Sequence, residues 1–239
     1  MLSIIIPAYN SEKFVLRALN SIADQTFIDY EIIIINDGST DNTLKLITKF
    51  KEKHANIDMT IFDIINQGHG AARNLGIEHA KHEYIWFVDA DDFIYNKYSF
   101  EKAALDLNKY KPDLYIFSVF ETNFGKRKKV WNFAKKDKLT TIKESPYLYL
   151  SQSWSWNKPV KRSLLIDNNI RFNSELMFED IYLFSEIYPK TKSIYISTDI
   201  KYVYVKHEDS LTGSLKNFKK YPQALTHASI SMVKTIFKK

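Results

Sequence analysis

The sequence predicts an α/β protein built on a doubly wound, mostly parallel sheet with flanking helices. Short β-branched runs alternate with segments of helical apolar spacing through the first ninety residues. One run, YEIIII, is apolar without a break, as expected of a parallel strand that is covered on both faces. Polar clusters follow each run, at the edge where open α/β sheets bind ligands. A β-α-β-α-β-α-β order with right-handed crossovers accounts for these observations.

The first half contains four predicted strands and three predicted helices. They are, in order, a strand LSIII, a helix over residues 11–23, a strand YEIIII, a helix carrying Leu44, Ile47 and Phe50, a strand MTIFDI, a helix over residues 70–80, and a strand YIWFVDADD with an acidic end. Asn10 or Ser11 is expected to cap the first helix, and Thr40 or Asp41 the second, because their short polar side chains accept hydrogen bonds from free helix amides.

The second half is less regular. We expect, in order, a helix over residues 100–109, a strand DLYIFSVF, a lysine-rich loop or hairpin, an aromatic segment over residues 147–156, a helix over residues 178–187, strands SIYIS and KYVYVKH, and an amphipathic helix over residues 222–236 with Ala224, Leu225, Ala228, Met232 and Ile236 on one side. No repeat or low-complexity linker separates the halves, so one compact unit is expected.

Composition excludes several classes of protein. Of 239 residues, 45% are hydrophobic and 26% charged, which argues against wholesale disorder. The lack of cysteine excludes disulfides and cysteine-ligated metals. Apolar runs fall far short of the roughly 20 residues of a membrane-spanning helix, and no basic segment precedes the N-terminal run as in a signal peptide. A cytoplasmic location is therefore expected.

The net charge of +6 is unevenly distributed. Residues 126–143 carry eight basic groups and one acidic group, and residues 216–239 carry six basic groups and no acidic group. An acidic body with two basic patches does not suggest a nucleic-acid partner. The patches suit an anionic surface or substrate, and the basic tail suits peripheral contact with the inner face of a membrane. Solvated lysines explain both patches equally well, and a solvated terminal helix or a truncation boundary at Lys239 explains the tail equally well.

The chain is poor in glycine and arginine, which makes their positions informative. Four of the six glycines lie between residues 38 and 76, where positive φ angles or a close ligand approach would need them. Arg73 is one of only five arginines, beside 29 lysines. Its planar, permanently charged fork suits a diphosphate or a carboxylate.

An acidic cluster follows the fourth predicted strand. Asp89, Asp91 and Asp92 would repel one another and raise each other's pKa values. A divalent cation would hold them charged, and oxygen ligands favour Mg²⁺ or Mn²⁺ over zinc. The alternative is an acidic helix N-cap.

Four motifs, in order and spacing, carry a resemblance to a known family. SIIIPAYN, IINDGSTDNT, NQGHGAARNLG and FVDADD resemble the inverting glycosyltransferase family 2, whose fold is called GT-A. SWNKPVKRSLL and FEDIYLF extend the resemblance over residues 1–215. It implies one catalytic domain, with a nucleotide-sugar half (1–92), an acceptor half (93–215) and a separate basic tail (216–239). Residues 121–145 match no element of the family.

The resemblance implies an activity. A hexose or N-acetylhexosamine would pass from a UDP-sugar to a hydroxyl of a glycan or lipid-linked glycan acceptor, by single addition. The setting would be bacterial cell-surface polysaccharide: capsule, lipopolysaccharide or teichoic acid. The donor sugar, the acceptor and the linkage are not readable from the motifs.

The resemblance also implies roles for individual residues. Those expected at the nucleotide-sugar are Pro7, Ala8 and Tyr9 at the nucleoside, Asp37 at the uracil, Arg73 near the diphosphate, and Asp89, Ala90 and Asp91 as the DXD element. Asp180 would be the catalytic base, with Glu179, Trp156 and Lys158 on the acceptor side. Asp91 would bind Mn²⁺ or Mg²⁺, with His207 as a further ligand.

Three other classes of protein are alternatives. A sugar nucleotidyltransferase usually has a glycine- and arginine-rich loop after the first strand, where this chain has PAYNSEK. A dinucleotide-dependent oxidoreductase would have G-x-G-x-x-G at that point, and it does not occur there. A catalytically inactive sugar-nucleotide-binding module is the third, although every candidate carboxylate is present.

Overall fold

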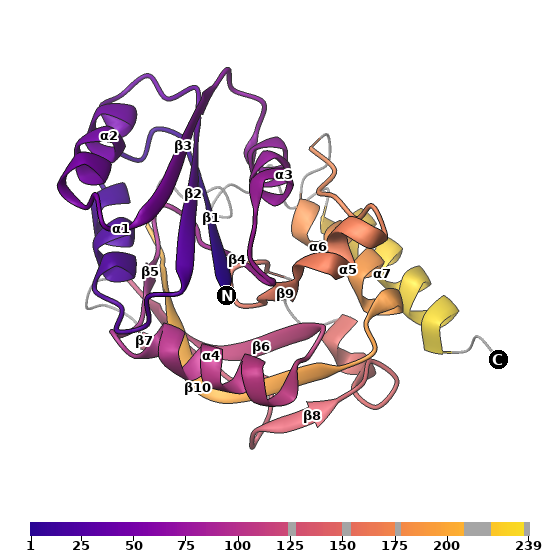
Figure 1. Ribbon diagram of the computed structural model, residues 1–239. Helices are drawn as coiled ribbons and strands as arrows, with labels where there is room; N and C mark the ends of the chain where they lie inside the picture. Colours follow the sequence, from indigo (N-terminus) through magenta and orange to yellow (C-terminus); the bar gives the residue numbers. More distant parts are fainter. Residues whose placement is uncertain (124–127, 150–153, 175–177, 208–220, 237–239) are drawn as a thin grey trace.

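One large sheet with helices on both faces forms the body of the protein (Figure 1). The computed structural model describes residues 1–123, 128–149, 154–174, 178–207 and 221–236. In order, the elements are β1 (Leu2–Ala8), α1 (Val15–Ala23), β2 (Tyr30–Asp37), α2 (Thr43–Lys53), β3 (Asp58–Ile64), α3 (His69–His79), β4 (Tyr84–Phe87), β5 (Phe93–Ile94), α4 (Ser99–Tyr110), β6 (Leu114–Thr122), β7 (Lys128–Trp131), β8 (Lys138–Thr140), η1 (Pro146–Tyr149), β9 (Val160–Lys161), α5 (Arg162–Asp167), α6 (Glu179–Ile187), η2 (Tyr188–Lys190), β10 (Ile194–Val205) and α7 (Tyr221–Ile236).

The first half is the predicted doubly wound unit. Strands β3, β2, β1 and β4 lie side by side and run parallel. Alternate residues of each strand point to opposite faces, so Ile4 and Ile32 pack beneath α1 and α2, whereas Ile5 and Ile33 pack beneath α3. Figure 1 shows α1 and α2 on one side of these strands and α3 on the other. The expected α/β fold with a mostly parallel sheet is confirmed.

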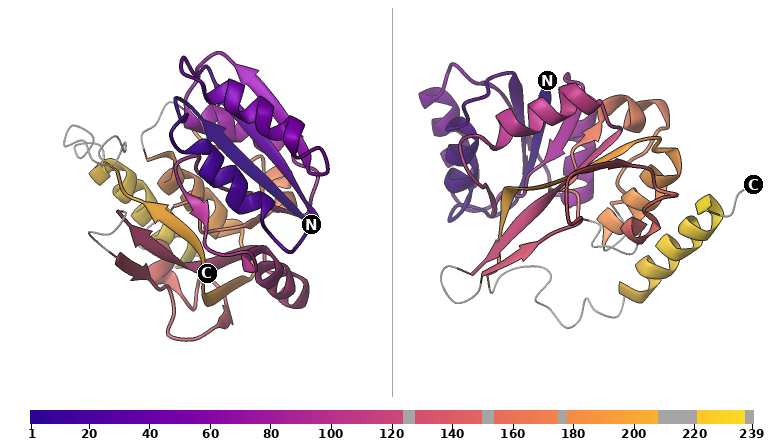
Figure 2. Two further views of the ribbon diagram at one scale, coloured as in Figure 1. Left: turned by 90° about the vertical axis from the view of Figure 1, so that its left-hand side faces the viewer. Right: turned by 90° about the horizontal axis from the view of Figure 1, so that it is seen from below.

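The second half extends the same sheet. The two-residue strand β9 pairs antiparallel with both β4 and β6 and so joins the halves. Strand β10 runs parallel to β6 and antiparallel to β5 and β8. The prediction of two strands, SIYIS and KYVYVKH, was wrong because one strand with a register shift between Ser197 and Ile200 covers both. The lysine-rich stretch contributes β7 and β8, and Figure 2 shows them beside the long strands β6 and β10.

The predicted helix caps met different outcomes. Helix α1 begins at Val15 and not at residue 11, because the preceding residues form a turn in which the Ser11 carbonyl accepts the amides of Phe14 and Val15. No side chain caps α1, so the predicted caps were wrong. At α2 the N-cap residue is Asn42, without a capping side-chain bond, but the neighbouring Asp41 carboxylate does accept the Thr43 amide at 2.9 Å.

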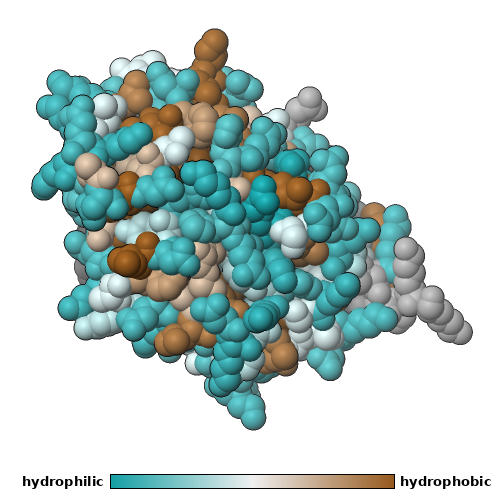
Figure 3. Space-filling model, viewed as in Figure 1, coloured by the Kyte–Doolittle hydropathy of each residue, from teal (hydrophilic) through white to brown (hydrophobic). Residues whose placement is uncertain are grey.

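Helix α7 lies beside α6 (Figure 1), and the Ser231 hydroxyl donates to the Ser185 carbonyl at 2.6 Å. The predicted apolar side chains of this helix, from Ala224 to Ile236, lie outside the side chains that the structure describes. Within the described residues, no helix combines the length and apolar character needed to cross a membrane. Figure 3 shows a face covered mostly by hydrophilic residues, with hydrophobic residues in separate patches.

Candidate active site

The carboxyl ends of β1 and β2 form one side of the candidate site. Tyr9 follows β1 and is 42% exposed, whereas Pro7 and Ala8 are buried within the strand. Asp37 ends β2, and its two carboxylate oxygens accept the backbone amides of Gln67 at 2.7 Å and Gly68 at 2.9 Å. Asp37 therefore fixes the turn that leads into α3. Its expected contact with uracil stays a prediction.

Two glycines make this turn possible. Gly38 has a φ angle of +67° and Gly68 a φ angle of +89°, in the left-handed region that glycine adopts without steric cost. A Cβ atom on Gly38 would also lie 2.7 Å from the backbone nitrogen of Asn66. The expectation that glycine serves backbone conformation here is confirmed at both positions.

Arg73 joins two acidic segments that are far apart in the sequence. From α3, one terminal nitrogen binds the Asp89 carboxylate at 2.8 Å and the other binds Glu179 at 2.9 Å. The guanidinium lies over the Phe172 ring, and the residue is only 4% exposed. Burial favours a lower pKa for Arg73, but the charges of Asp89, Asp180 and Glu179 together hold it above the ordinary value of arginine. Arg73 thus brings the turn after β4 to the start of α6 through carboxylates, which the sequence allowed as its partners. Its expected place near the diphosphate stays a prediction.

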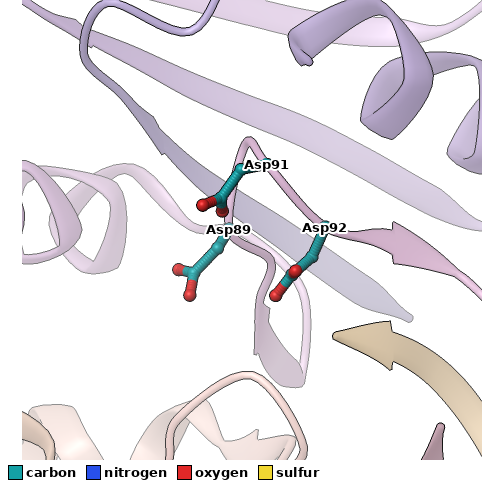
Figure 4. A group of neighbouring side chains, drawn as sticks. All are labelled: Asp89, Asp91 and Asp92. Carbon is teal, nitrogen blue, oxygen red and sulfur yellow. The ribbon is translucent and has the colours of Figure 1, made fainter. Parts of the chain in front are cut away.

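The acidic turn after β4 presents three carboxylates together, as Figure 4 shows. Asp89, Asp91 and Asp92 each offer an oxygen within 4.8 Å of the others. Ala90, between them, is buried. Burial, and then the charge of Asp89, raises the pKa of Asp91. Burial and both neighbouring carboxylates raise the pKa of Asp92 well above its usual range.

Strand β10 holds Asp92 in place. Its oxygens accept the Val205 amide at 2.7 Å and the Tyr202 hydroxyl at 2.8 Å, and the side chain is 1% exposed. The same hydroxyl accepts the Asp89 amide at 3.1 Å. Asp92 is therefore occupied in fixing the turn, whereas the binding roles expected of Asp89 and Asp91 stay predictions.

His207 follows β10 and reaches the acidic turn. Its Nε2 lies 2.7 Å from an Asp91 oxygen, and its ring stacks on Phe14 with centroids 4.8 Å apart. The other ring nitrogen, Nδ1, is buried without a partner. An imidazole nitrogen beside a carboxylate can share a divalent cation, because one ion can take a lone pair from each. The residues therefore fit the predicted Mn²⁺ or Mg²⁺, and Asp91 and His207 as its ligands stay a prediction.

The start of α6 carries the predicted catalytic base. Asp180 accepts the Ser155 amide on Oδ2 at 3.3 Å, and its Oδ1 is buried without a partner. Burial raises the pKa of Asp180 to about 7; Arg73 opposes the shift, while Glu179 and Asp89 add to it. Phe178, just before the helix, has a left-handed φ angle of 62°. Such a conformation costs a bulky residue about 1 kcal/mol or more, as strained positions at functional sites often do.

Aromatic residues pack between α6 and the acidic turn. Trp156 stacks on Trp154 at 4.5 Å and on Tyr202 at 4.9 Å. Trp156 is 3% exposed and Lys158 is completely buried, which differs from the acceptor surface expected for both. Trp154 is only partly buried, so it is the tryptophan of this stack with exposed surface.

Sequence reasoning missed three contributors to the site. Arg17 donates to the Asp91 carbonyl, Ser155 donates to Asp180, and Tyr202 connects Asp89 to Asp92. Each acts through a contact between distant segments, so no local pattern indicates it. The tyrosine-rich composition of KYVYVKH was the only available signal.

Comparison with known proteins identifies the family. An α/β sheet with an acidic turn at its carboxyl edge is the GT-A arrangement. Residues 3–170 match the model of glycosyl transferase family 2, and the chain belongs to this family.

Two curated relatives act on poly(ribitol-phosphate), according to their names. The chain is 31% identical over 205 residues to poly(ribitol-phosphate) beta-N-acetylglucosaminyltransferase TarS of Staphylococcus aureus, which covers 84% of this chain and 35% of that protein. It is 32% identical over 216 residues to poly(ribitol-phosphate) beta-glucosyltransferase of Bacillus spizizenii, covering 87% of this chain and 32% of that protein. The chain thus spans about a third of the length of these relatives.

A solved structure of TarS has a similar fold. The crystal structure of S. aureus TarS 1-349 in complex with UDP-GlcNAc superposes with a TM-score of 0.84 at 27% identity. The match covers 99% of this chain and 68% of that one.

Proposed function

We propose that this chain is an inverting glycosyltransferase that moves a hexose or N-acetylhexosamine from a UDP-sugar to a hydroxyl of a glycan acceptor in bacterial cell-surface polysaccharide. The observation that carries the proposal is the Arg73 bridge, which brings Asp89 and the Glu179–Asp180 pair to one site. Membership of family 2 and the UDP-GlcNAc complex of the similar TarS structure support the choice of donor.

Asp180 is the base in this proposal. The acceptor oxygen attacks the anomeric carbon as its proton passes to an Asp180 oxygen, and the bond from that carbon to the diphosphate oxygen breaks, releasing UDP. A single displacement inverts the configuration. Oδ1 suits the role because it is buried near the site without a hydrogen-bond partner. A pKa of about 7 lets the same carboxyl take up a proton near neutral pH.

Asp91 and His207 would hold the metal, with Asp89 beside them. A bound divalent cation neutralises charge that develops on a leaving diphosphate. Arg73 keeps Asp89 oriented, Tyr202 fixes the turn, and the exposed Tyr9 lies at the carboxyl edge where a nucleoside would bind. Residues 1–92 would then form the donor half of the site and residues 93–215 the acceptor half.

A screen for UDP release tests the proposal. Purified protein and Mn²⁺ are incubated with UDP-glucose, UDP-galactose, their N-acetyl forms and UDP-glucuronic acid. We expect slow release from one donor, lost in Asp91→Ala and in Asp180→Asn, with UDP binding by calorimetry kept in Asp180→Asn. Unchanged release in Asp180→Asn would contradict the assignment of the base. Binding of UDP without release from any donor would favour an inactive binding module.

A further inference from the structure

Lys158 is buried in a way that needs an explanation. It is 0% exposed. Its Nζ lies 5.6 Å from the centroid of the Phe133 ring and 5.1 Å from the centroid of the Phe184 ring. Its ammonium donates to the Trp154 carbonyl and to the Asn157 Oδ1, both at 2.9 Å. Moving an ammonium ion out of water is costly unless hydrogen bonds and opposite charges compensate for the lost hydration.

The hydrogen bond to Trp154 leads directly to Asp180. The Trp154 carbonyl and the Ser155 N–H belong to one peptide group. Lys158 donates to the oxygen of that group, and the nitrogen of the same group donates to Asp180 Oδ2 at 3.3 Å. A cation at the oxygen end of a peptide strengthens the N–H as a donor, because hydrogen bonds in a chain polarise one another.

We propose that Lys158 is a positioning residue for the transfer reaction, acting on the Asp180 carboxylate through the peptide group between Trp154 and Ser155. The lysine holds that peptide so that its N–H points at Oδ2, and its charge favours the ionised carboxylate. Oδ1 is thereby left to face the reaction. The inference rests on the proposed role of Asp180 as the base.

Charged groups on four different segments interact electrostatically with Asp180. They are Arg73 on α3, Glu179 on α6, Asp89 after β4, and Lys158 before β9. Of the charged groups among the described residues, Arg73 and Lys158 favour the ionised carboxylate, and Arg73 already binds both Asp89 and Glu179. Burial lowers the pKa of Lys158 itself to about 7, so the lysine carries its charge below that pH. Removing the charge of Lys158 should therefore raise the pKa of Asp180 by about one unit.

A carboxylate titration by ¹³C NMR tests the proposal without a substrate or a metal. The signal of Asp180 in aspartate-labelled protein is assigned by its loss in Asp180→Asn. Lys158→Met removes both charge and donor, and Lys158→Gln keeps a donor without the charge. Lys201→Met is the matched control, because Lys201 is also 0% exposed and its ammonium lies 3.4 Å from both Ser197 and Asp199.

We expect the pKa of Asp180 to rise by about one unit in Lys158→Met, by less in Lys158→Gln, and not in Lys201→Met. If Lys158 only stabilised the turn, both methionine variants would melt at lower temperature and neither would move the pKa, which would overturn the proposal. Should Lys158→Met fail to fold, as judged by near-ultraviolet circular dichroism, an unmoved pKa in Lys158→Gln would overturn it equally.

The pH profile of UDP release provides a functional readout. Lys158→Met should shift its acidic limb upward by about one unit, so the rate falls about tenfold near pH 6 and recovers at high pH. The KM for the donor should not change, because the proposed function places Lys158 in the acceptor half of the site. If wild-type protein releases no UDP, the proposed function fails while the NMR titration still decides the role of Lys158. If the wild-type protein releases UDP and the acidic limb of the pH profile does not shift in Lys158→Met, only the proposed role of Lys158 fails.

Discussion

Replacing Asp180 with asparagine should destroy transfer and yet stabilise the fold. Asparagine has the shape of a protonated carboxyl and can still accept the Ser155 amide, but it cannot take up a proton. The wild-type carboxyl is costly to ionise because it is buried and faces Glu179 and Asp89. The substitution removes that cost along with the catalytic base.

The magnitude follows from the pKa of Asp180. It is about 7 in the fold, against about 3.9 in an unfolded chain. Because the folded value is raised, the stability that the carboxyl contributes is fully present below about pH 3.9 and is lost as the pH rises through about 7. Relative to asparagine, Asp180 should cost about 4 kcal/mol at pH 8 and about 1.5 kcal/mol at pH 5.

Thermal unfolding at the two pH values measures this difference. For a chain of this length, about 2 °C per kcal/mol gives a gain of about 8 °C in Tm at pH 8 and about 3 °C at pH 5 for Asp180→Asn. Asp167→Asn is the control: Asp167 is an exposed carboxylate at the end of α5, so its Tm should barely change. A lower Tm for Asp180→Asn at pH 8, or an equal gain at both pH values, would refute the reasoning.

Three further substitutions test other parts of the site. Arg73→Met leaves two half-buried carboxylates without their shared cation and should cost about 3 kcal/mol, measured by urea unfolding; a loss below about 1 kcal/mol would show that Arg73 does not hold the site together. Asp91→Ala and His207→Ala should each weaken Mn²⁺ binding at least about tenfold, as measured by calorimetry. Unchanged affinity in both variants would show that the metal does not bind at these residues. Tyr202→Phe removes a hydroxyl that serves two groups of the acidic turn, so it should lower stability by about 1–3 kcal/mol and slow UDP release; a wild-type Tm would contradict this.

The first half of the fold was predictable because its signals are local. A continuous apolar run such as that of β2 indicates a strand that is covered on both faces. The apolar spacing of a helix is likewise contained within the residues of that helix. Strands β5 and β9 were missed because two residues carry no periodicity, and pairing with distant strands defines them. In β7 the side chains are mostly exposed and rich in lysine, so only the backbone pairing with β6 reveals a strand.

The location of the candidate site was predictable from the sequence, but the contacts between its side chains were not. Strand order places the polar residues after each strand at one edge, so Asp89 and Asp91 were expected at a common site. Arg73 was expected at a diphosphate or a carboxylate, but local spacing could not name its partner Glu179, which lies 106 positions away along the chain. Lys158 was expected at an acceptor surface, and only tertiary packing shows that it is buried. Contacts between distant side chains leave no trace in local spacing.

The anomeric configuration of the first product tests the central claim most directly. Wild-type protein, Mn²⁺ and the donor from the screen are followed by ¹H NMR from the first minutes of donor hydrolysis, before the released sugar mutarotates. Because the donor is α-linked and water takes the place of the acceptor, a single displacement assisted by Asp180 predicts the β-anomer first, and none from Asp180→Asn. Initial release of the α-anomer would contradict the account.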